Sequence, residues 1–387
     1  MQKTVKLYDI DSHLKEFEAT VLLCEKCKNG YKTVLDKTAF FPEGGGQPCD
    51  TGTLNGGNVT DVQISDGIIT HTVDIPLEIG NRVKGKLDFL RRFNFMQNHS
   101  GEHIVSGIVH SLYGLDNVGF HLNESFVTLD FNGELNNEQL KNVELIANSK
   151  VWQNVKFKTY YPDKTTLKSL NYRSKKELDG DIRIVEIENT DICACCAPHV
   201  NTAGEIGIIK LLDTEKMRGG IRIVMKCGKY ALDDYNCKYG NILSISNLLS
   251  SKQEETAQAV VELQNKLSDA KVQISDLKKR LTEYIIKSFK GDDGYIFEDG
   301  LDGKERQLLA DGLHKTYGGI KAVFTKAQDG YSFSICGEPA ELDSFFENLC
   351  NNLNVRGGGR NGIKQGTVLE DKDKIIDVWS KLWIGQK

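Results

Sequence analysis

Two histidines one helical turn apart are the residues of this chain that point most directly to chemistry. His99 and His103 lie within residues 93–112, where apolar side chains recur at helical spacing. Imidazoles four residues apart project from one face of a helix and can bind the same tetrahedral metal ion. Ser100 follows the first histidine, so this is not the metalloprotease motif, which requires a glutamate at that position. Alone, a histidine pair at this spacing is a weak signal, because such pairs are usually solvated or locally hydrogen-bonded.

A second group of candidate ligands follows in residues 191–199. Cys195 and His199 could complete a site of one cysteine and three histidines, which is a reasonable donor set for Zn²⁺. Cys193 and Cys196 are rival ligands that spacing alone does not exclude. Neither half of the zinc deaminase motif, His-x-Glu followed by Pro-Cys-x-x-Cys, is present. The sequence therefore predicts a metal site shared by a helix and a distant downstream segment.

The bulk composition is that of a globular protein long enough for two or three domains. The chain has 387 residues, of which 39% are hydrophobic and 27% charged. Its formal net charge of -5 gives no overall attraction for nucleic acid, so an RNA partner would need local basic patches. The first residues are charged, and no apolar run approaches the roughly 20 residues that span a bilayer. Ten cysteines without an export signal favour reduced thiols and a cytoplasmic location. Because no long apolar run is present, we expect no membrane contact.

Changes of pattern along the chain predict an α+β protein of four parts. Residues 1–90 combine short alternating strands with clustered glycines, which favours a small β-barrel. Residues 91–235 mix helices with strands and carry the candidate metal ligands. Residues 236–290 contain an a/d heptad pattern from Val260 to Tyr284, as expected for a long helix or coiled coil that pairs subunits or packs within its own domain. Residues 291–387 have an α/β pattern.

Three motifs in order resemble the editing half of alanyl-tRNA synthetase and its free-standing relatives, the alanyl-tRNA editing proteins (AlaX). They are the glycine-rich segment 38–52, the histidine pair in 98–103, and the segment 183–207 with Cys195 and His199. This resemblance covers about residues 1–235. In one departure, Cys196-Ala197-Pro198 stands where the family usually has two glycines and a threonine. The last hundred residues resemble, less sharply, the domain that follows the editing domain; a similar domain is attached to DHH phosphoesterases, whose aspartate-rich catalytic domain has no counterpart here.

The resemblance implies a zinc-dependent aminoacyl-tRNA deacylase, an ester hydrolase acting on mischarged tRNA(Ala). Ser-tRNA(Ala) is the first candidate substrate and Gly-tRNA(Ala) the second. No segment resembles an aminoacylation core, so we expect editing without charging, and the tail of the long AlaX proteins implies a homodimer through the helical segment. The alternative from another class is a non-catalytic, zinc-stabilised module for tRNA binding and dimerisation. A threonyl-type substrate is a third hypothesis, against which the Gly-Gly-Gly-Gln motif argues.

The resemblance also suggests roles for single residues in substrate binding and catalysis. Thr38 would recognise the serine hydroxyl, because a site built to hydrogen-bond a hydroxyl rejects an analogue lacking it. Gly44, Gly45 and Gly46 would bring backbone amides close to an anionic ligand, although a tight barrel turn explains them equally well. The candidate catalytic residues are Gln47, which would hydrogen-bond the amino acid or ribose, and Glu102, which is a general base or, as we favour, a partner of a metal ligand.

Basic residues provide the expected contacts with RNA. Arg91 and Arg92 precede the metal helix and would contact phosphate, whereas Lys84 and Lys86 nearby fit a solvated face better. In the tail, basic residues around three glycines would contact tRNA. These are Arg356, Arg360 and Lys364.

Overall fold

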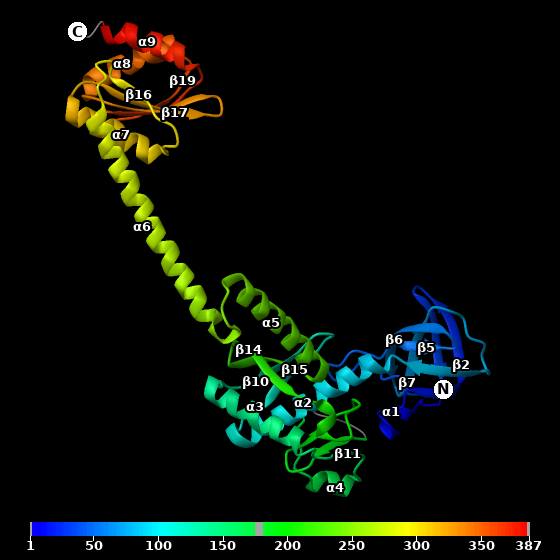
Figure 1. Ribbon diagram of the computed structural model, residues 1–387. Coiled ribbons are helices and arrows are strands. Elements are labelled where there is room, and N and C mark those ends of the chain that lie inside the picture. Colours follow the sequence, from blue (N-terminus) through cyan, green and yellow to red (C-terminus); the bar gives the residue numbers. More distant parts are fainter. Residues whose placement is uncertain (1, 175–180, 385–387) are drawn as a thin grey trace. The chain divides into compact units, whose positions relative to one another are not determined.

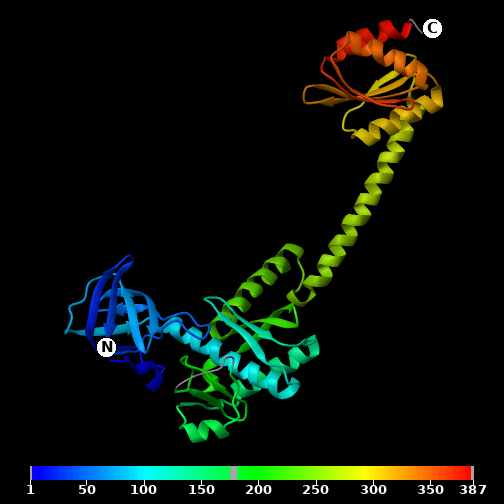
Figure 2. The same ribbon diagram turned by 180° about the vertical axis from the view of Figure 1, so that it is seen from behind.

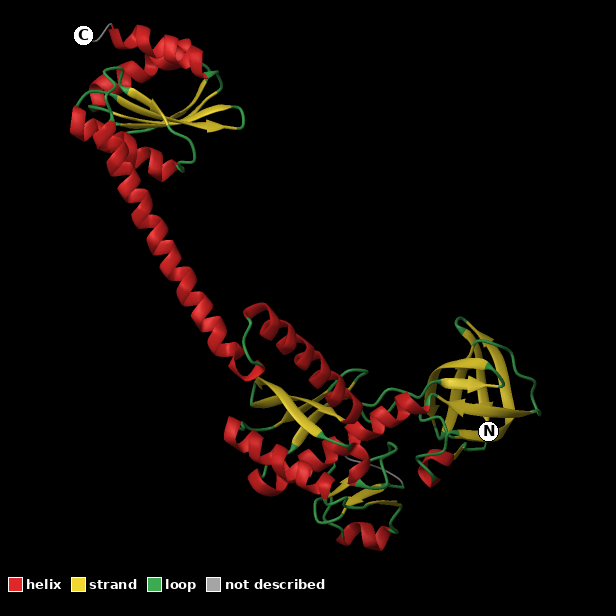
Figure 3. Cartoon of the chain, in the orientation of Figure 1, coloured by secondary structure: helices red, strands yellow, loops and turns green. Residues whose placement is uncertain are grey.

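The computed structural model describes residues 2–174 and 181–384 of the chain. It divides into two compact units, Met1–Ser244 and Ile245–Lys387. The first unit combines helices with several sheets and the second combines helices with a five-stranded sheet, so the expected α+β composition is confirmed (Figure 3). Within the described ranges, no helix is both long and apolar enough to cross a membrane.

The N-terminal part of the first unit is a closed barrel of six strands. The strands follow one another around the barrel in the order β2-β3-β7-β6-β5-β8 (Figure 1). Their bounds are β2 (Glu16–Cys27), β3 (Gly30–Leu35), β5 (Gly52–Leu54), β6 (Gly57–Ser65), β7 (Ile68–Val73) and β8 (Arg82–Leu87). Alternate residues of β7 and β8 are buried, as expected for strands with one face on a core. Two short strands, β1 (Val5–Lys6) and β4 (Lys37–Thr38), pair in parallel, and helix α1 (Leu7–Ile10) follows β1.

Helix α2 (Phe89–Tyr113) is the central element of the first unit. Its N-cap, Asp88, accepts a hydrogen bond from the backbone of Arg91, and it ends at Gly114 in the left-handed conformation. Figure 2 shows this helix running from the barrel into the α+β part of the unit. A four-stranded sheet, ordered β14-β15-β10-β9, packs there with α2 and α3 (Asn137–Trp152) around one hydrophobic core. These strands are β9 (Asn117–Leu122), β10 (Val127–Phe131), β14 (Ile209–Met217) and β15 (Gly220–Cys227).

A smaller sheet brings the second candidate ligand segment to α2. Its strands, in the order β11-β12-β13, are β11 (Phe157–Tyr160), β12 (Ile184–Ile187) and β13 (Asp191–Ala194). A Cβ at Gly107 of α2 would lie 2.7 Å from the Thr190 carbonyl oxygen and 2.7 Å from Asp191 Cβ. Only glycine therefore lets β13 approach the helix this closely. The remaining elements of this part are α4 (Lys164–Ser169), η1 (Ala203–Ile206) and α5 (Gly228–Leu249), which crosses the boundary between the units.

The second unit joins a long helix to an α/β domain. Helix α6 (Thr256–Ser288) follows η2 (Gln253–Glu255) and leads to a five-stranded sheet ordered β16-β17-β18-β20-β19. The strands are β16 (Tyr295–Phe297), β17 (Lys321–Ala327), β18 (Gly330–Cys336), β19 (Val355–Gly358) and β20 (Ile363–Val368). In Figure 1, α8 (Pro339–Asn352) and α9 (Lys372–Ile384) lie on one side of this sheet and α7 (Gly303–Tyr317) on the other. Buried aromatic residues such as Phe324 and Trp379 fill the core.

The heptad residues of α6 are exposed in the single chain. Apart from Ala270, the large apolar residues of the stripe have exposed fractions of 40–69%. They are Val260, Leu263, Leu267, Ile274, Leu277, Leu281 and Tyr284. The stripe is therefore present on one continuous helix, and its partner stays a prediction.

A buried ion pair links the barrel to α2. Arg92, which is only 1% exposed, donates from Nε to both carboxylate oxygens of Asp50 at 2.9 Å and from Nη2 to the same group. It also donates to the carbonyl oxygens of Ser12 at 3.2 Å and Ala39 at 2.6 Å. The expectation that Arg92 contacts phosphate does not fit this location, because its donors already face acceptors inside the protein. Arg92 instead fixes the barrel on α2.

Replacing Arg92 by leucine should destabilise the first unit strongly. Asp50 would be left as a buried carboxylate without its cation, which typically costs about 3–5 kcal/mol. Urea unfolding of the purified protein measures this loss. The control is Arg82→Leu, because the Arg82 side chain is 83% exposed and lies 3.9 Å from Glu18, a surface pair worth less than about 1 kcal/mol. Equal small effects of both changes would contradict the structural role of Arg92.

Candidate metal centre

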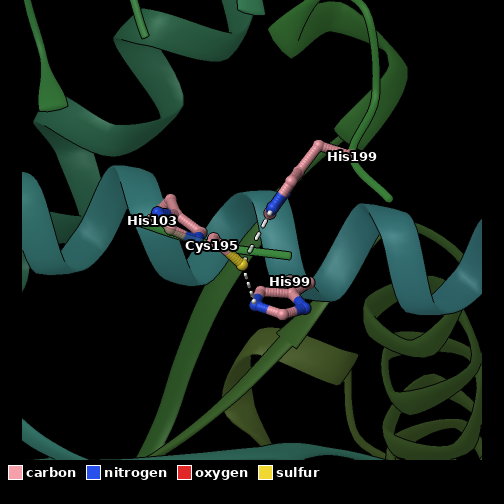
Figure 4. Close-up of side chains that lie close together, drawn as sticks. All are labelled: His99, His103, Cys195 and His199. Atoms are coloured by element: carbon pink, nitrogen blue, oxygen red, sulfur yellow. Dashed lines mark hydrogen bonds between the residues drawn. The ribbon is translucent and has the colours of Figure 1, made fainter. Parts of the chain in front are cut away.

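Four side chains converge where the loop after β13 meets α2. His99 and His103 come from adjacent turns of α2, and Cys195 and His199 come from the loop (Figure 4). Their candidate ligand atoms all lie within 4.8 Å of one another. Cys195 Sγ is 3.4 Å from His199 Nε2 and 3.6 Å from His99 Nε2. All three histidines are buried.

These distances suit zinc. Zinc–nitrogen bonds of about 2.0–2.1 Å and zinc–sulfur bonds of about 2.3 Å place tetrahedral nitrogen and sulfur ligands roughly 3.6 Å apart. The two sulfur–nitrogen separations at Cys195 agree with this value. One thiolate and three imidazoles are also a donor set that zinc commonly takes. The residues present therefore fit a zinc ion in both chemistry and spacing.

Each of the three imidazoles has a hydrogen-bond partner at its Nδ1 atom. His99 Nδ1 lies 2.8 Å from Gln47 Oε1, and His103 Nδ1 lies 3.3 Å from Asp191 Oδ2. His199 Nδ1 lies 3.2 Å from Ser100 Oγ. An amide oxygen and a carboxylate only accept hydrogen bonds, so the Nδ1 atoms facing Gln47 and Asp191 carry the proton. The Nε2 atoms of His99 and His103 are then free to bind a metal, whereas the Ser100 hydroxyl can donate or accept and fits either tautomer of His199.

The charges at the site favour a thiolate beside neutral imidazole. Burial opposes ionisation of Cys195, but His99 and His199 outweigh it and hold the pKa of the thiol well below its ordinary value. Burial lowers the pKa of His199 to about 3, so this imidazole is neutral. At His103 burial also favours the neutral form, yet Glu102, Cys193 and Asp191 raise its pKa above the ordinary value. A metal ion would displace a proton from His103 on binding.

The two rival cysteines lie outside the four-residue group. Cys193 is buried and forms a separate group with His103 and Asp191. Cys196 is exposed, and its sulfur would lie 3.9 Å from a Cβ built at Gly45. The geometry thus brings together the four ligands expected from the sequence, and their role as ligands stays a proposal.

Glu102 is placed to support the ligands. Its carboxylate is fully buried, and Oε1 accepts hydrogen bonds from Ser106 Oγ and Asn117 Nδ2, both at 2.7 Å. Its Oε2 lies 3.8 Å from His103 Nε2. Glu102 is thus a neighbour of the candidate ligands, and its role as a general base or as a partner of a ligand stays a prediction.

The glycine motif forms a tight two-residue turn. Gly44 and Gln47 exchange backbone hydrogen bonds of 3.1 and 3.0 Å, and Gly45 and Gly46 have φ angles of 61° and 79°. These angles are those of the type I′ turn that closes hairpins. A Cβ at Gly46 would lie 2.5 Å from the Phe120 carbonyl oxygen, so the turn packs closely against β9. Within residues 2–174 and 181–384, the amides of Gly45 and Gly46 have no hydrogen-bond partner.

Gln47 carries an unsatisfied donor at the site. The residue is 1% exposed, and its Oε1 is engaged by His99. Its Nε2 is buried and has no hydrogen-bond partner in the part of the chain that the structure describes. A buried donor without a partner is costly, typically by about 1–3 kcal/mol. Its presence beside the four candidate metal-binding residues therefore favours a bound molecule that places an acceptor there.

Thr38 lies inside the barrel, next to a histidine that the sequence analysis did not connect with it. Thr38 Oγ1 is 2.9 Å from His71 Nε2 and accepts a hydrogen bond from the Phe40 amide at 3.1 Å. His71 Nδ1 donates to the Thr33 carbonyl oxygen at 3.1 Å, and burial lowers the pKa of His71 to about 4. Neutral His71 therefore accepts the Thr38 hydroxyl proton. The role of Thr38 in recognising a substrate stays a prediction.

The remaining cations near α2 are paired. Arg91 donates to Glu124 Oε1 at 2.7 Å and to the Cys49 carbonyl oxygen at 2.5 Å, and its guanidinium lies over the Phe95 ring. Lys84 forms an ion pair with Glu16 at 2.6 Å on the barrel surface. Arg91 remains partly exposed, so phosphate contact by this residue stays a prediction.

Several residues of the site were missed in the sequence. Ser100 and Asp191 are hydrogen-bond partners of ligands, and Gly107 makes room for Asp191. Two local signals were available, because Ser100 is adjacent to His99 and Gly107 lies one further helical turn beyond His103. Asp191 offered no comparable signal, since its pairing with α2 depends on the tertiary fold.

Purified protein should contain about one zinc ion per chain, held by His99, His103, Cys195 and His199. Replacing Cys195 by alanine should abolish most of the bound zinc, because the only thiolate of the group is lost. The matched control is Cys196→Ala, which should retain wild-type zinc. Metal analysis by mass spectrometry measures both. Retention of zinc in Cys195→Ala together with loss in Cys196→Ala would show that the rival cysteine is the ligand.

Two protein-family models match segments of the chain that contain residues of the candidate site. The family model "Threonyl and Alanyl tRNA synthetase second additional domain" matches residues 182–224, which include Cys195 and His199. The model "tRNA synthetases class II (A)" matches residues 7–91, which include the barrel and the glycine turn.

Full-length relatives cover both units of the chain. Alanine–tRNA ligases of Ignicoccus hospitalis and Pyrococcus abyssi are 28% and 29% identical over 98% and 95% of this chain. The chain spans only 43% and 42% of the length of these two ligases. Alanyl-tRNA editing protein AlaX-L of Pyrococcus horikoshii is 28% identical over 96% of both proteins. The expected resemblance is thus confirmed: over nearly its whole length this chain is similar to an alanyl-tRNA editing protein of the AlaX-L type and to part of the alanyl-tRNA synthetases.

Proposed function

We propose that this chain is a zinc-dependent deacylase that hydrolyses the ester of mischarged tRNA(Ala), with Ser-tRNA(Ala) as the main substrate and Gly-tRNA(Ala) as the second. The observation that carries the proposal is the buried group of four zinc-compatible residues beside the unsatisfied amide of Gln47. The similarity to AlaX-L over nearly the whole of both chains supports the same reaction class.

Gln47 has a specific part in the proposed reaction. Attack of water on an ester places negative charge on the carbonyl oxygen, and donors already in position stabilise that charge. The Nε2 group of Gln47 would donate to this oxygen, while its Oε1 continues to hold His99. A bound zinc ion would supply Lewis-acid polarisation, and its four protein ligands favour a role in positioning the substrate.

The glycine turn and Thr38 would provide recognition. The amides of Gly45 and Gly46 lie in a turn that also carries Gln47, and amides of this kind bind anionic groups such as the terminal phosphate of tRNA. Because Thr38 gives its proton to His71, it can only accept a hydrogen bond from a substrate. A serine hydroxyl can donate one and the alanine methyl group cannot, so the correctly charged tRNA would be spared.

Contacts with the body of tRNA would come from exposed basic residues in the second unit. Arg356 and Arg360 are exposed at the β19–β20 hairpin, whereas Lys364 pairs with Asp343 at 2.5 Å. We expect the two arginines to contribute to RNA affinity through phosphate contacts.

Release of serine and glycine from mischarged tRNA(Ala) tests the proposed reaction directly. In Gln47→Glu the side chain keeps an oxygen for His99 Nδ1 but loses its N–H donor. Zinc content should therefore persist while the deacylation rate falls by about 10²–10³-fold, the usual effect of losing one such donor. The matched control is Gln139→Glu in the capping box of α3, where glutamate serves equally well.

Two outcomes of this experiment would contradict different parts of the proposal. A wild-type rate in Gln47→Glu would remove Gln47 from the reaction. Wild-type protein that binds zinc and tRNA but releases neither amino acid would be the non-catalytic tRNA-binding module.

We also propose that α6 pairs with α6 of a second chain. Its exposed heptad stripe is the reason, because a/d residues at this spacing pack against a partner helix. Changing Leu267 and Ile274 to glutamate should convert a dimer to monomers, as charges in a buried seam are strongly unfavourable. The control, Asn265→Glu with Ser275→Glu, adds the same charge at exposed positions outside the stripe. Light scattering gives the mass, and an unchanged mass in the seam variant would exclude this dimer contact.

A further inference from the structure

Among the residues that the structure describes, carboxylates hold only one of the three candidate ligand histidines. His99 and His199 have neutral partners, the Gln47 amide oxygen and the Ser100 hydroxyl. His103 has Asp191, whose side chain is almost fully buried. Carboxylates in this position fix the orientation of a metal-binding imidazole and strengthen it as a donor. His103 is therefore the ligand whose properties depend most on a charged neighbour.

Asp191 is in turn held by Arg173. Arg173 donates from Nε to Asp191 Oδ1 and from Nη2 to Asp191 Oδ2, both at 2.7 Å. This two-point contact uses both oxygens and fixes the plane of the carboxylate. The carboxylate that faces His103 is thus fixed in direction by a cation.

The backbone of Arg173 adds to the same contact. Its amide donates to the Ile192 carbonyl oxygen, and its carbonyl oxygen accepts from the Ala194 amide, both at 2.9 Å. Arg173 thereby pairs alongside β13, the strand that leads into Cys195. One residue therefore holds the strand by its backbone and the strand's buried carboxylate by its side chain.

We propose that Arg173 is a positioning residue of the metal centre, which sets zinc affinity by fixing Asp191 against His103. The proposal rests on the zinc site of the proposed function. Arg173 acts through the orientation of a ligand and does not contact the metal.

Arg173→Lys is the sharpest test, because lysine keeps the positive charge and loses the two-point contact. Zinc affinity, measured by competition with a chromophoric chelator, should fall about tenfold, at the lower end of the range for changes around metal ligands. The visible spectrum of the cobalt(II)-substituted protein should shift, because it reports ligand orientation. Asp191→Asn should weaken zinc binding at least as much. Adding Arg173→Lys to Asp191→Asn should then cause little further loss, since both act through one contact.

Arg222→Lys is the matched control. Arg222 makes the same two-point contact with Asp130, at 2.7 and 2.8 Å, between β15 and β10. This variant should lose thermal stability to a similar degree and keep wild-type zinc affinity and cobalt spectrum. If Arg173→Lys does not fold, Arg173→Gln, which can still donate to one carboxylate oxygen, replaces it in the same measurements.

The outcomes are separable from those of the proposed function. Wild-type zinc affinity and an unchanged cobalt spectrum in the Arg173 variant would overturn the proposal, as would equal loss of zinc affinity in Arg222→Lys. Absence of zinc binding in the wild-type protein would instead contradict the zinc site itself. Deacylation assays are not needed for either conclusion.

Discussion

The candidate metal centre depends on the direction of three imidazole rings. Each ring is oriented by a hydrogen-bond partner at Nδ1, and the three partners come from different parts of the first unit. Gln47 belongs to the barrel turn, Ser100 to α2, and Asp191 to β13. The site can therefore form only when barrel, helix and small sheet are packed together. The Arg92–Asp50 ion pair is one of the contacts that hold the barrel to the helix.

This dependence explains why so many polar groups are buried near α2. Almost the whole helix from Phe95 to Val109 is enclosed, and its polar residues serve the site or its neighbours. Glu102 is satisfied by Ser106 and Asn117, and Asn98 binds the Cys227 amide. Buried networks of this kind specify one arrangement only when nearly every member is paired. Against that background, Gln47 Nε2 has no partner among the described residues, which supports its proposed role in binding a substrate.

Local patterns allowed the helix, the strands and the four candidate ligands to be predicted, because periodicity and spacing are properties of neighbouring residues. Contacts between distant residues could not be predicted in the same way. Arg92 and Asp50 are 42 positions apart, and nothing near Arg92 distinguishes it from the partly exposed Arg91. The bond between Thr38 and His71 and the contact of Arg173 with Asp191 also arise only from the tertiary fold. The exposed stripe on α6 shows the reverse case, where the pattern predicts a packing contact and the structure leaves the stripe residues exposed.

Gly107 has a consequence for the design of similar centres. Along one face of α2, positions 99 and 103 carry candidate metal ligands, and position 107 carries a glycine, which has no side chain. The vacant third position receives Asp191, which then reaches back one turn to His103. A designer who grafted only the two histidines onto a helix would reproduce the donors and leave the second with no room for its carboxylate. The pattern to copy therefore has three positions, two histidines followed by a glycine. The glycine is as specific a requirement as the two histidines.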